Sequence, residues 1–316
     1  MTILLEEADV EKLLSMDLAI EAIEEAFKLQ GEHKVQVAPR SRCSLSKSML
    51  HVMSASLPTL GFAGLKTYSS VAAKTVFHVM LYDLSGALVA MIQANKLGQM
   101  RTGAATAVAT KYMSRQNASR LGIIGTGWQA RAQVQAVCAV RRLRDITAYS
   151  RNPENCRKFC EEMTQATGIS VLPAEAPEDA VKEMDIVVTA TNSKKPVLKG
   201  EWLSEGVHIN SIGSNFLSSQ EIDIEAVEKC DCVIVDSVEQ ARLEAGDLAY
   251  AVEKGDFFWE DARELGQVVI GEYPGREDAK EITLFESQGI ALEDIALAAK
   301  VYAKAEEEEM GKPLAL

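Results

Sequence analysis

A glycine-rich turn is the stretch whose residue types and spacing have the clearest chemical meaning. Residues 121–124 form an apolar run of strand length, Gly125-Thr126-Gly127 follow, and residues 128–140 carry apolar side chains at helical spacing. The pattern Gly-x-Gly-x-x-Ala closes at Ala130. The first glycine permits a tight turn, the second admits a pyrophosphate, and the small third residue lets the helix pack on the strand. Any tight strand-to-helix turn favours glycine, but a strand, this turn and a helix in that order predict a dinucleotide site at the helix start.

The end of the next expected strand, residues 145–150, bears on which dinucleotide is bound. NAD sites of this kind carry an acidic residue there, which binds the ribose 2′-hydroxyl. Here the strand ends in Ser150-Arg151-Asn152-Pro153, without a carboxylate. Arg151 can meet a 2′-phosphate, and Ser150 and Asn152 can donate further hydrogen bonds. The alternative is that Arg151 is a solvated turn residue. The sequence therefore favours NADP(H), with NAD(H) possible.

The bulk properties predict an ordinary globular protein. Its 316 residues suit about two domains, and 47% hydrophobic and 25% charged residues can form a sizeable core. A net charge of −13 argues against nucleic acid as a partner. The sequence has no apolar run of membrane-spanning length, and its acidic N-terminal segment is unlike a signal peptide, so we expect no membrane partner and a cytoplasmic location. Six cysteines in no zinc pattern predict free thiols and no metal.

The first third of the chain reads as a mixed α and β region. Residues 8–29 have helical periodicity, and residues 31–70 suggest a meander of short strands. Residues 76–82 and 87–92 flank a turn and predict a β-hairpin. Residues 100–113 are small and apolar, which predicts a closely packed helix.

From residue 121 onwards, apolar runs alternate with helical patterns. Expected helices include residues 153–166 and 177–184, and the expected strands are 121–125, 145–150, 169–172, 185–191, 207–213, 232–236 and 281–285. This alternation predicts an α/β, doubly wound Rossmann-type domain over residues 118–289. A last helix at 290–309 is expected to pack on the first region. Residues 1–117 with 290–316 would then form a second, α+β domain.

Several further motifs, in order along residues 64–294, resemble the ornithine cyclodeaminase/μ-crystallin family. They are Gly64-Leu65-Lys66, Arg101-Thr102-Gly103-Ala104-Ala105, Ile124-Gly125-Thr126-Gly127 with Gln129-Ala130, Asp185–Thr191, His208-Ile209-Asn210 with Gly213, and Ser287-x-Gly289-x-Ala291-x-x-Asp294. The resemblance implies a homodimer whose 118–289 domain binds a nicotinamide cofactor and whose other domain binds substrate and forms the dimer interface. The family includes ornithine cyclodeaminase, archaeal-type alanine dehydrogenase, imine and ketimine reductases and a hormone-binding crystallin, so fold alone does not fix the activity.

The resemblance implies hydride transfer at the α-carbon of an amino or imino acid, whose carboxylate needs a cationic partner. It places that role on Arg40, Lys66 and Arg101, with Arg42 an alternative to Arg40. An unpaired ammonium would be costly in the apolar stretch around Lys66, and Lys66 is also the candidate to protonate or polarise the imine. Arg101 stands at the start of the expected helix, where its charge opposes the helix dipole, so we expect an anionic partner.

Cofactor contacts follow from the glycine turn, from the carboxyl edge of the sheet and from the resemblance. The expected cofactor-binding residues are Thr102, Gly125, Thr126, Gly127, Gln129, Ala130, Ser150, Arg151, Asn152, Thr189, Ala190, Thr191, Ser211, Ile212, Gly213, Ser287 and Gly289. Ser287 has ordinary helix capping as its alternative role.

One departure from the family pattern bears on the reaction. Where the cyclodeaminases have Gly-Ala-Asp, this chain has Gly213-Ser214-Asn215. An amide binds a substrate but is no general base, although Asn215 may be read instead as a turn cap. The sequence thus favours an NAD(P)-dependent oxidoreductase acting on CH–NH or CH–NH2 groups, an imine or ketimine reductase or an amino-acid dehydrogenase. The alternatives are an ammonia-eliminating lyase that recycles NAD and a non-catalytic crystallin-like binder. The identity of the small amino or imino acid is left open.

Overall fold

The computed structural model describes residues 2–71 and 74–315, and the chain divides into two compact units. The first unit comprises Met1–Arg101 with Ile290–Leu316, and the second comprises Thr102–Gly289. The sequence puts the domain boundary at 117/118, where Asn117-Ala118-Ser119 precedes the strand that enters the glycine turn. It lies instead between Arg101 and Thr102, inside the continuous helix α3 (Asn95–Met113). The chain returns to the first unit at Ile290.

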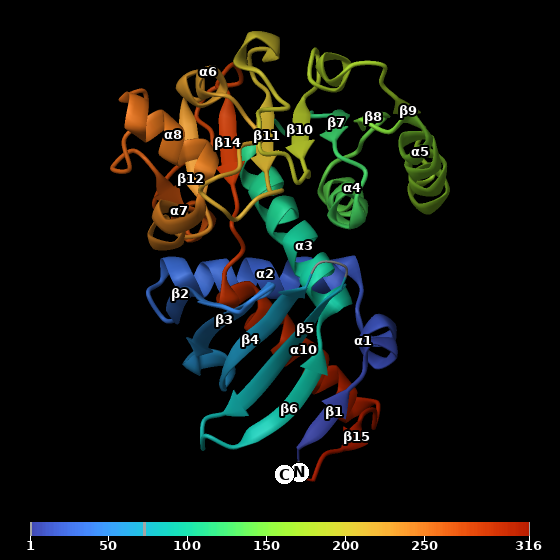
Figure 1. Cartoon of the computed structure of the whole chain (residues 1–316), viewed down its shortest axis with the longest axis vertical. Coiled ribbons are helices and arrows are strands. Elements are labelled where there is room, and N and C mark those ends of the chain that lie inside the picture. Colours follow the sequence, from blue (N-terminus) through green and yellow to red (C-terminus); the bar gives the residue numbers. More distant parts are fainter. Residues whose placement is uncertain (1, 72–73, 316) are drawn as a thin grey trace. The chain divides into compact units, whose positions relative to one another are not determined.

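The second unit is built on a parallel sheet. Its strands lie in the order β13-β12-β14-β11-β10-β7-β8-β9. Figure 1 labels them from β12 to β9. They are β7 (Arg120–Ile124), β8 (Asp145–Tyr149), β9 (Val171–Pro173), β10 (Ile186–Thr189), β11 (His208–Ser211), β12 (Cys232–Val235), β13 (Arg263–Glu264) and β14 (Thr283–Glu286). All ladders in this sheet are parallel. The chain reverses its direction of travel across the sheet between β7 and β10, which is the switch point where such sheets bind ligands.

Helices and apolar clusters cover this sheet, so strands such as β10, β11, β12 and β14 are fully buried, as parallel strands require. The helices are α4 (Trp128–Val140), α5 (Pro153–Thr167), α6 (Ile224–Glu228), α7 (Val238–Glu244), α8 (Gly246–Lys254) and α9 (Leu265–Val269). One cluster gathers side chains of α4 and α5, and another gathers side chains of α6, α7 and α8. The helix expected at 177–184 is wrong. Only a 3-10 turn, Pro177–Ala180, forms, and Glu183 has a left-handed φ of 59° that an α-helix cannot accommodate.

The first unit contains a mostly antiparallel sheet in the order β15-β1-β6-β5-β4-β3-β2. Its strands are β1 (Ile3–Leu5), β2 (Gln36–Ser44), β3 (Ser48–Leu57), β4 (Phe62–Val71), β5 (Lys74–Asp83), β6 (Leu88–Gln93) and β15 (Lys312–Pro313). The expected hairpin is confirmed as β5 and β6. The expectation of short strands over residues 31–70 is wrong: β2 runs for 9 residues, and β3 and β4 each run for 10. Pro58 and Gly61 are turn residues, as their types indicate, and they occupy the turn between β3 and β4.

Helices α1 (Glu7–Leu13), α2 (Met16–Gly31) and α10 (Ala291–Glu307) complete the first unit. The segment read as one helical region is two helices, because Ser15 caps α2 by accepting the N–H of Leu18. Helix α10 packs on α2 and on β3, β4 and β5 (Figure 1). Gly64 permits this approach, since a Cβ there would meet the Ile295 side chain and a backbone carbonyl.

Helix α3 begins five residues earlier than expected, with the Glu7 carboxylate accepting the N–H groups of Asn95 and Lys96. Arg101 therefore lies in the second turn rather than at the start, and the dipole argument for its partner does not hold. Among the described residues, no helix is both long and apolar enough to cross a membrane.

Candidate functional site

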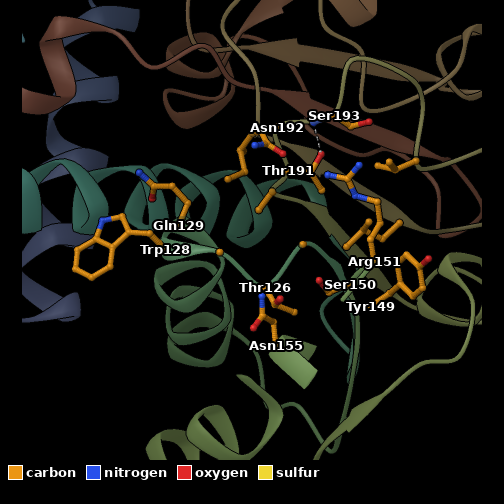
Figure 2. A pocket seen from close by; sticks show the side chains of 17 residues that line it. Thr126, Trp128, Gln129, Tyr149, Ser150, Arg151, Asn155, Thr191, Asn192 and Ser193 are labelled. Carbon is orange, nitrogen blue, oxygen red and sulfur yellow. Dashed lines mark hydrogen bonds between the residues drawn. The ribbon is translucent and has the colours of Figure 1, made fainter. Parts of the chain in front are cut away.

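A pocket of about 450 Å³ lies at the carboxyl ends of β7, β8, β10 and β11. Figure 2 shows side chains from the glycine turn, the start of α4 and the ends of β8 and β10 around it. Of the expected cofactor residues, those lining it are Gly125, Thr126, Gly127, Gln129, Ser150, Arg151, Ala190, Thr191, Ile212 and Gly213. Trp128, Tyr149, Asn155, Asn192, Ser193 and Val197 also line it; sequence reasoning missed them, although several adjoin predicted residues.

The glycine turn has the backbone that its residues predict. Gly125 has φ of +108°, its N–H donates to the Tyr149 carbonyl at 2.9 Å, and a Cβ there would meet the Ala190 carbonyl group. Gly127 caps α4 and has open space where a Cβ would stand. Ala130 is fully buried beneath the turn, so it supports the helix and does not line the pocket. The free N–H groups of α4 and this open backbone suit a pyrophosphate.

The end of β8 carries the charge of the pocket. Arg151 is exposed there beside Ser150, and of the side chains that the structure describes no carboxylate lines this pocket. Asn152 lies just outside the lining, because its Oδ1 accepts the N–H of Asn155 at 3.0 Å and caps α5. Asn155, one turn into α5, lines the pocket instead. The pocket is therefore neutral or positive where an adenine ribose is expected to bind.

Behind the pocket lie polar residues that the sequence assigned to cofactor contact. Thr189 and Ser211 are buried under the lining and hydrogen-bond to each other's hydroxyl at 3.3 Å. Ser287 donates to the Asp236 carboxylate at 3.0 Å, as does the N–H of Gly289 at 2.5 Å. Thr102 is buried in α3. None of the five lines the described pocket.

Two buried carboxylates, Glu221 and Asp247, stand behind the same edge and were missed from the sequence. Burial raises the pKa of Glu221 to about 7, with the nearby Asp247 raising it further. Burial likewise raises the pKa of Asp247 to about 6. Both lie in loops or helix starts after β11, where no local motif marks them.

The first unit holds a buried cluster of charged side chains. Lys66 of β4 forms an ion pair with Asp294 of α10 at 2.8 Å, and its side chain is 3% exposed. Arg101 of α3 contacts Asp294 at 3.2 Å and Glu293 at 2.7 Å. Arg40 is also buried, beside the bulge in β2, and its Nε donates to the Met53 sulfur at 3.3 Å. Because Met53 pairs with Lys66 across the strands, Arg40 lies in the same row, whereas Arg42 is one row further along.

The charges in this cluster perturb one another. Burial lowers the pKa of Lys66 to about 8; the Asp294 carboxylate opposes this, while Arg101 and Arg40 add to it. Burial raises the pKa of Glu293, and the Arg101 guanidinium opposes that change. Asp294 keeps one buried oxygen, Oδ2, without a hydrogen-bond partner among the described residues. The sequence had matched Asp294 only as a family position; its place beside Glu293 on an apolar helix was the available signal of a buried ion pair.

An aromatic row borders Lys66. His51, Tyr68 and Phe77 are cross-strand neighbours on β3, β4 and β5, with His51 stacked on Tyr68 at 4.2 Å and Tyr68 packed on Phe77 at 4.8 Å. The Lys66 nitrogen lies 5.0 Å from the Phe77 ring centre. Burial, with Arg42 and Arg40 nearby, lowers the pKa of His51 to about 4, so this row is neutral at physiological pH.

The remaining predicted positions fall elsewhere. Asn215 lies in the loop after β11, outside the described pocket lining. His208 is a core residue: it is fully buried, its Nδ1 lies 3.0 Å from the Thr283 hydroxyl, and burial lowers its pKa to about 3. In residues 2–71 and 74–315, no group of three or more histidine, cysteine or acidic side chains could hold a metal ion.

The parallel sheet, the glycine turn and the pocket at the switch point define a dinucleotide-binding protein. The chain is 37% identical over 325 residues to alanine dehydrogenase of Archaeoglobus fulgidus, covering 99% of this chain and 98% of the relative. Its fold matches Thermococcus litoralis Δ1-pyrroline-2-carboxylate reductase in complex with NADH and L-proline, at a TM-score of 0.95 and 36% identity over 99% of this chain and 100% of that one. It also matches an archaeal alanine dehydrogenase dimer with bound NAD, at a TM-score of 0.94 and 36% identity over 99% of each chain.

The family model for ornithine cyclodeaminase/mu-crystallin proteins matches residues 1–309, and this chain belongs to that family. It is an NAD(P)-dependent oxidoreductase acting on CH–NH or CH–NH2 groups, of the imine reductase or amino-acid dehydrogenase kind. The resemblance drawn from the sequence motifs is thereby confirmed, as is the Rossmann-type fold.

Proposed function

We propose that this enzyme interconverts a small 2-imino acid and the corresponding amino acid, with a nicotinamide dinucleotide in the pocket of the second unit. The observation that carries the proposal is the buried group of three cations: Lys66 and Arg101, which both pair with Asp294, and Arg40, which lies close enough to lower the pKa of Lys66. Burying three cations is costly, and a site for an anionic substrate is a reason to retain them. The reaction also requires a binding site for the dinucleotide, and the glycine-turn pocket is our candidate for it.

Each residue of the cluster has a role that its chemistry suits. Arg101 and Arg40 hold the substrate carboxylate, since a guanidinium can bind it in a fixed orientation. Lys66, with a pKa near 8, can give a proton to the imine nitrogen in reduction and take it back in oxidation. Asp294 holds both Lys66 and Arg101 in place. When bound, the dinucleotide supplies or accepts the hydride at the α-carbon, and the protein contributes orientation and the proton.

The neutral aromatic row supports a small, uncharged substrate side chain. His51, Tyr68 and Phe77 offer apolar faces beside Lys66 and no carboxylate that could hold a second ammonium. A cyclic imino acid or an alanine-sized substrate suits this lining better than a diamino acid. Asn215, an amide where the cyclodeaminases have an acid, points the same way.

A substrate panel tests the proposal directly. Cyclic imino acids, and 2-oxo acids supplied with ammonia or methylamine, are each given with reduced cofactor, and cofactor oxidation is followed. Net oxidation with an uncharged substrate is expected. Conversion of ornithine without net cofactor turnover would instead support the lyase, and no turnover at all would support a binding protein.

We further propose a preference for NADP(H), with NAD(H) as the alternative. Arg151 and Ser150 line the pocket and no described lining residue is acidic, although the solved relatives named above bind NAD or NADH. Arg151→Asp should lower kcat/KM with NADPH by about tenfold or more, because a charge-assisted contact contributes roughly 1.5–3 kcal/mol. Steady-state kinetics with both cofactors checks this. A wild-type preference for NADH would contradict the role given to Arg151.

We propose that the chain forms a homodimer through the sheet of the first unit. Helix α10 covers one face of that sheet, while side chains of the other face, including Val52, Leu65 and Met80, remain partly exposed. A second copy would cover such an apolar face, and one solved relative is a dimer. Light scattering at micromolar concentration should give twice the chain mass of 34.4 kDa. A mass equal to one chain would reject the proposal.

The cysteines support a reducing compartment. All six are free thiols, and Cys156 and Cys160 stay unbridged although they are one helical turn apart. We therefore propose that the enzyme works in the cytoplasm.

A further inference from the structure

Glu221 makes contacts that belong to the cofactor pocket although it does not line it. Its carboxylate accepts the backbone N–H of Thr191 at 2.6 Å and the backbone N–H of Gly213 at 2.6 Å. Thr191 and Gly213 follow β10 and β11 and both line the pocket. The same carboxylate accepts the Thr189 hydroxyl at 3.0 Å. One buried side chain thus joins the ends of two strands directly behind the pocket.

A second carboxylate fixes Glu221 itself. Asp247, at the start of α8, accepts the backbone N–H groups of Glu221 at 2.7 Å and Ile222 at 3.2 Å. Its other oxygen accepts the Ser211 hydroxyl at 2.8 Å, and Ser211 contacts Thr189. The hydrogen bonds therefore form a closed ring through Glu221, Thr189, Ser211 and Asp247. Gly213 belongs to the arrangement, since a Cβ there would collide with the Glu221 carboxylate.

The charged form of Glu221 suits this ring better than the neutral form. An ionised carboxylate offers acceptors only, and here one oxygen faces the N–H of Thr191 and the other faces the N–H of Gly213. If the carboxyl were protonated, one of its oxygens would carry an O–H donor that faces these N–H donors. Burial, with the Asp247 carboxyl on α8 nearby, raises the pKa of Glu221 to about 7. Glu286 on β14 faces the same carboxyls, and burial together with Asp247, Asp236 and Glu221 raises its pKa well above the usual value. Glu221 therefore changes charge in the physiological range.

We propose that Glu221 is a positioning residue for the dinucleotide, whose ionised carboxylate holds the Thr191 and Gly213 backbones in the binding conformation, with Asp247 holding Glu221. This rests on the proposed placement of the dinucleotide in this pocket. It follows that cofactor affinity rises as Glu221 loses its proton. Glu221 lies behind the residues that line the pocket, so we assign it a positioning role and not a catalytic one.

The test compares Glu221→Gln with wild type in the full chain. The amide keeps the size of the side chain but presents an NH2 group to one of the two backbone N–H groups. The matched control is Asp185→Asn: Asp185 accepts the N–H groups of Ser119 and Arg120 at 2.8 and 2.9 Å, at the opposite edge of the same sheet. The dissociation constants of NADPH and NADH are measured by quenching of tryptophan fluorescence, which Trp128 in the pocket lining reports.

At about pH 8, Glu221→Gln should weaken cofactor binding by about tenfold, which corresponds to the loss of a hydrogen bond to a charged group. At about pH 6, where the wild-type carboxyl is itself protonated, the two proteins should bind almost equally. Asp185→Asn should match wild type at both pH values. Equal cofactor affinities of Glu221→Gln and wild type at about pH 8 would overturn the inference. An equal loss of affinity at both pH values would also overturn it, because a merely structural role of Glu221 does not depend on the charge of its carboxyl.

Thr189→Val provides a second variant if Glu221→Gln does not fold. It removes one hydrogen bond to the carboxylate and should weaken cofactor binding by a few-fold, again more at the higher pH. Unchanged affinity would overturn the inference. If the wild-type protein binds neither NADPH nor NADH, the proposed function itself fails. If it binds and the variants bind equally well, only the role of Glu221 fails.

Discussion

Replacing Asp294 by asparagine probes the charge cluster most directly. The Asp294 carboxylate lies 2.8 Å from the Lys66 ammonium, and the two side chains are 0% and 3% exposed. Its attraction is the largest effect that keeps Lys66 protonated against burial. Asparagine preserves the shape and removes the charge. The pKa of Lys66 should therefore fall below its present value of about 8, by about one to three pH units for a partner this close.

Both stability and activity should change, with a definite sign. Breaking a buried ion pair costs on the order of 3–5 kcal/mol, and the cost is largest at low pH, where Lys66 is charged in both the wild type and the variant. At about pH 9 Lys66 is largely neutral even in the wild type, so the loss of unfolding free energy should be smaller there. With Lys66 as the proposed proton donor, kcat/KM in the reductive direction should require its protonated form. The fall of kcat/KM at high pH, near pH 8 in the wild type, should start at lower pH in the variant.

Urea unfolding and the pH profile of cofactor oxidation measure the two effects. Glu293→Gln is the matched control, because Glu293 is adjacent on the same helix and pairs with Arg101 at 2.7 Å rather than with Lys66. It should lower stability without moving the high-pH limb. An unchanged limb in Asp294→Asn, or an equal displacement in Glu293→Gln, would refute the assignment of that limb to Lys66.

Further predictions concern the cationic side chains proposed to bind the substrate and the buried acidic side chains. Lys66→Ala and Arg101→Ala should each lower kcat/KM by more than about tenfold while cofactor affinity changes little, since losing one partner of a desolvated charge pair costs about 2–5 kcal/mol; near-normal kcat/KM in either would remove that residue from the site. The pKa values of Glu221 and Asp247 are raised by burial, so their stabilising contribution is complete below about pH 4 and is lost as pH rises through about 6 to 7. Denaturant unfolding at several pH values should show this decline, and Glu221→Gln should flatten it; a slope unchanged in the variant would contradict the stated pKa. The pKa of Asp185 is lowered, so its stabilising contribution is present at neutral pH and is lost as the pH falls.

Much of the fold, and the backbone of the candidate dinucleotide pocket, could be predicted from local sequence. The turn at Gly125 and Gly127 is defined by neighbouring residues, so its conformation and its place before α4 could be predicted. The alternation of apolar runs and helical patterns likewise fixed the parallel sheet. Predictions that depended on the exact first or last residue of a helix or strand were less accurate. Arg101 was put at a helix start because the capping group of α3, Glu7, lies 88 residues away from Asn95.

The partners of the functional residues were decided by tertiary structure alone. Lys66 signalled its need for an anion, because an unpaired ammonium in an apolar stretch is costly, but the partner, Asp294, is 228 residues distant. Glu221 gave no signal at all: an acidic residue in a polar loop looks solvated until β10, β11 and α8 bury it. The sequence determined which local backbone could receive a phosphate and which side chains carry charge. Only the fold decided which of those charges lie in low dielectric and close to one another, and those two conditions set their pKa values and their roles.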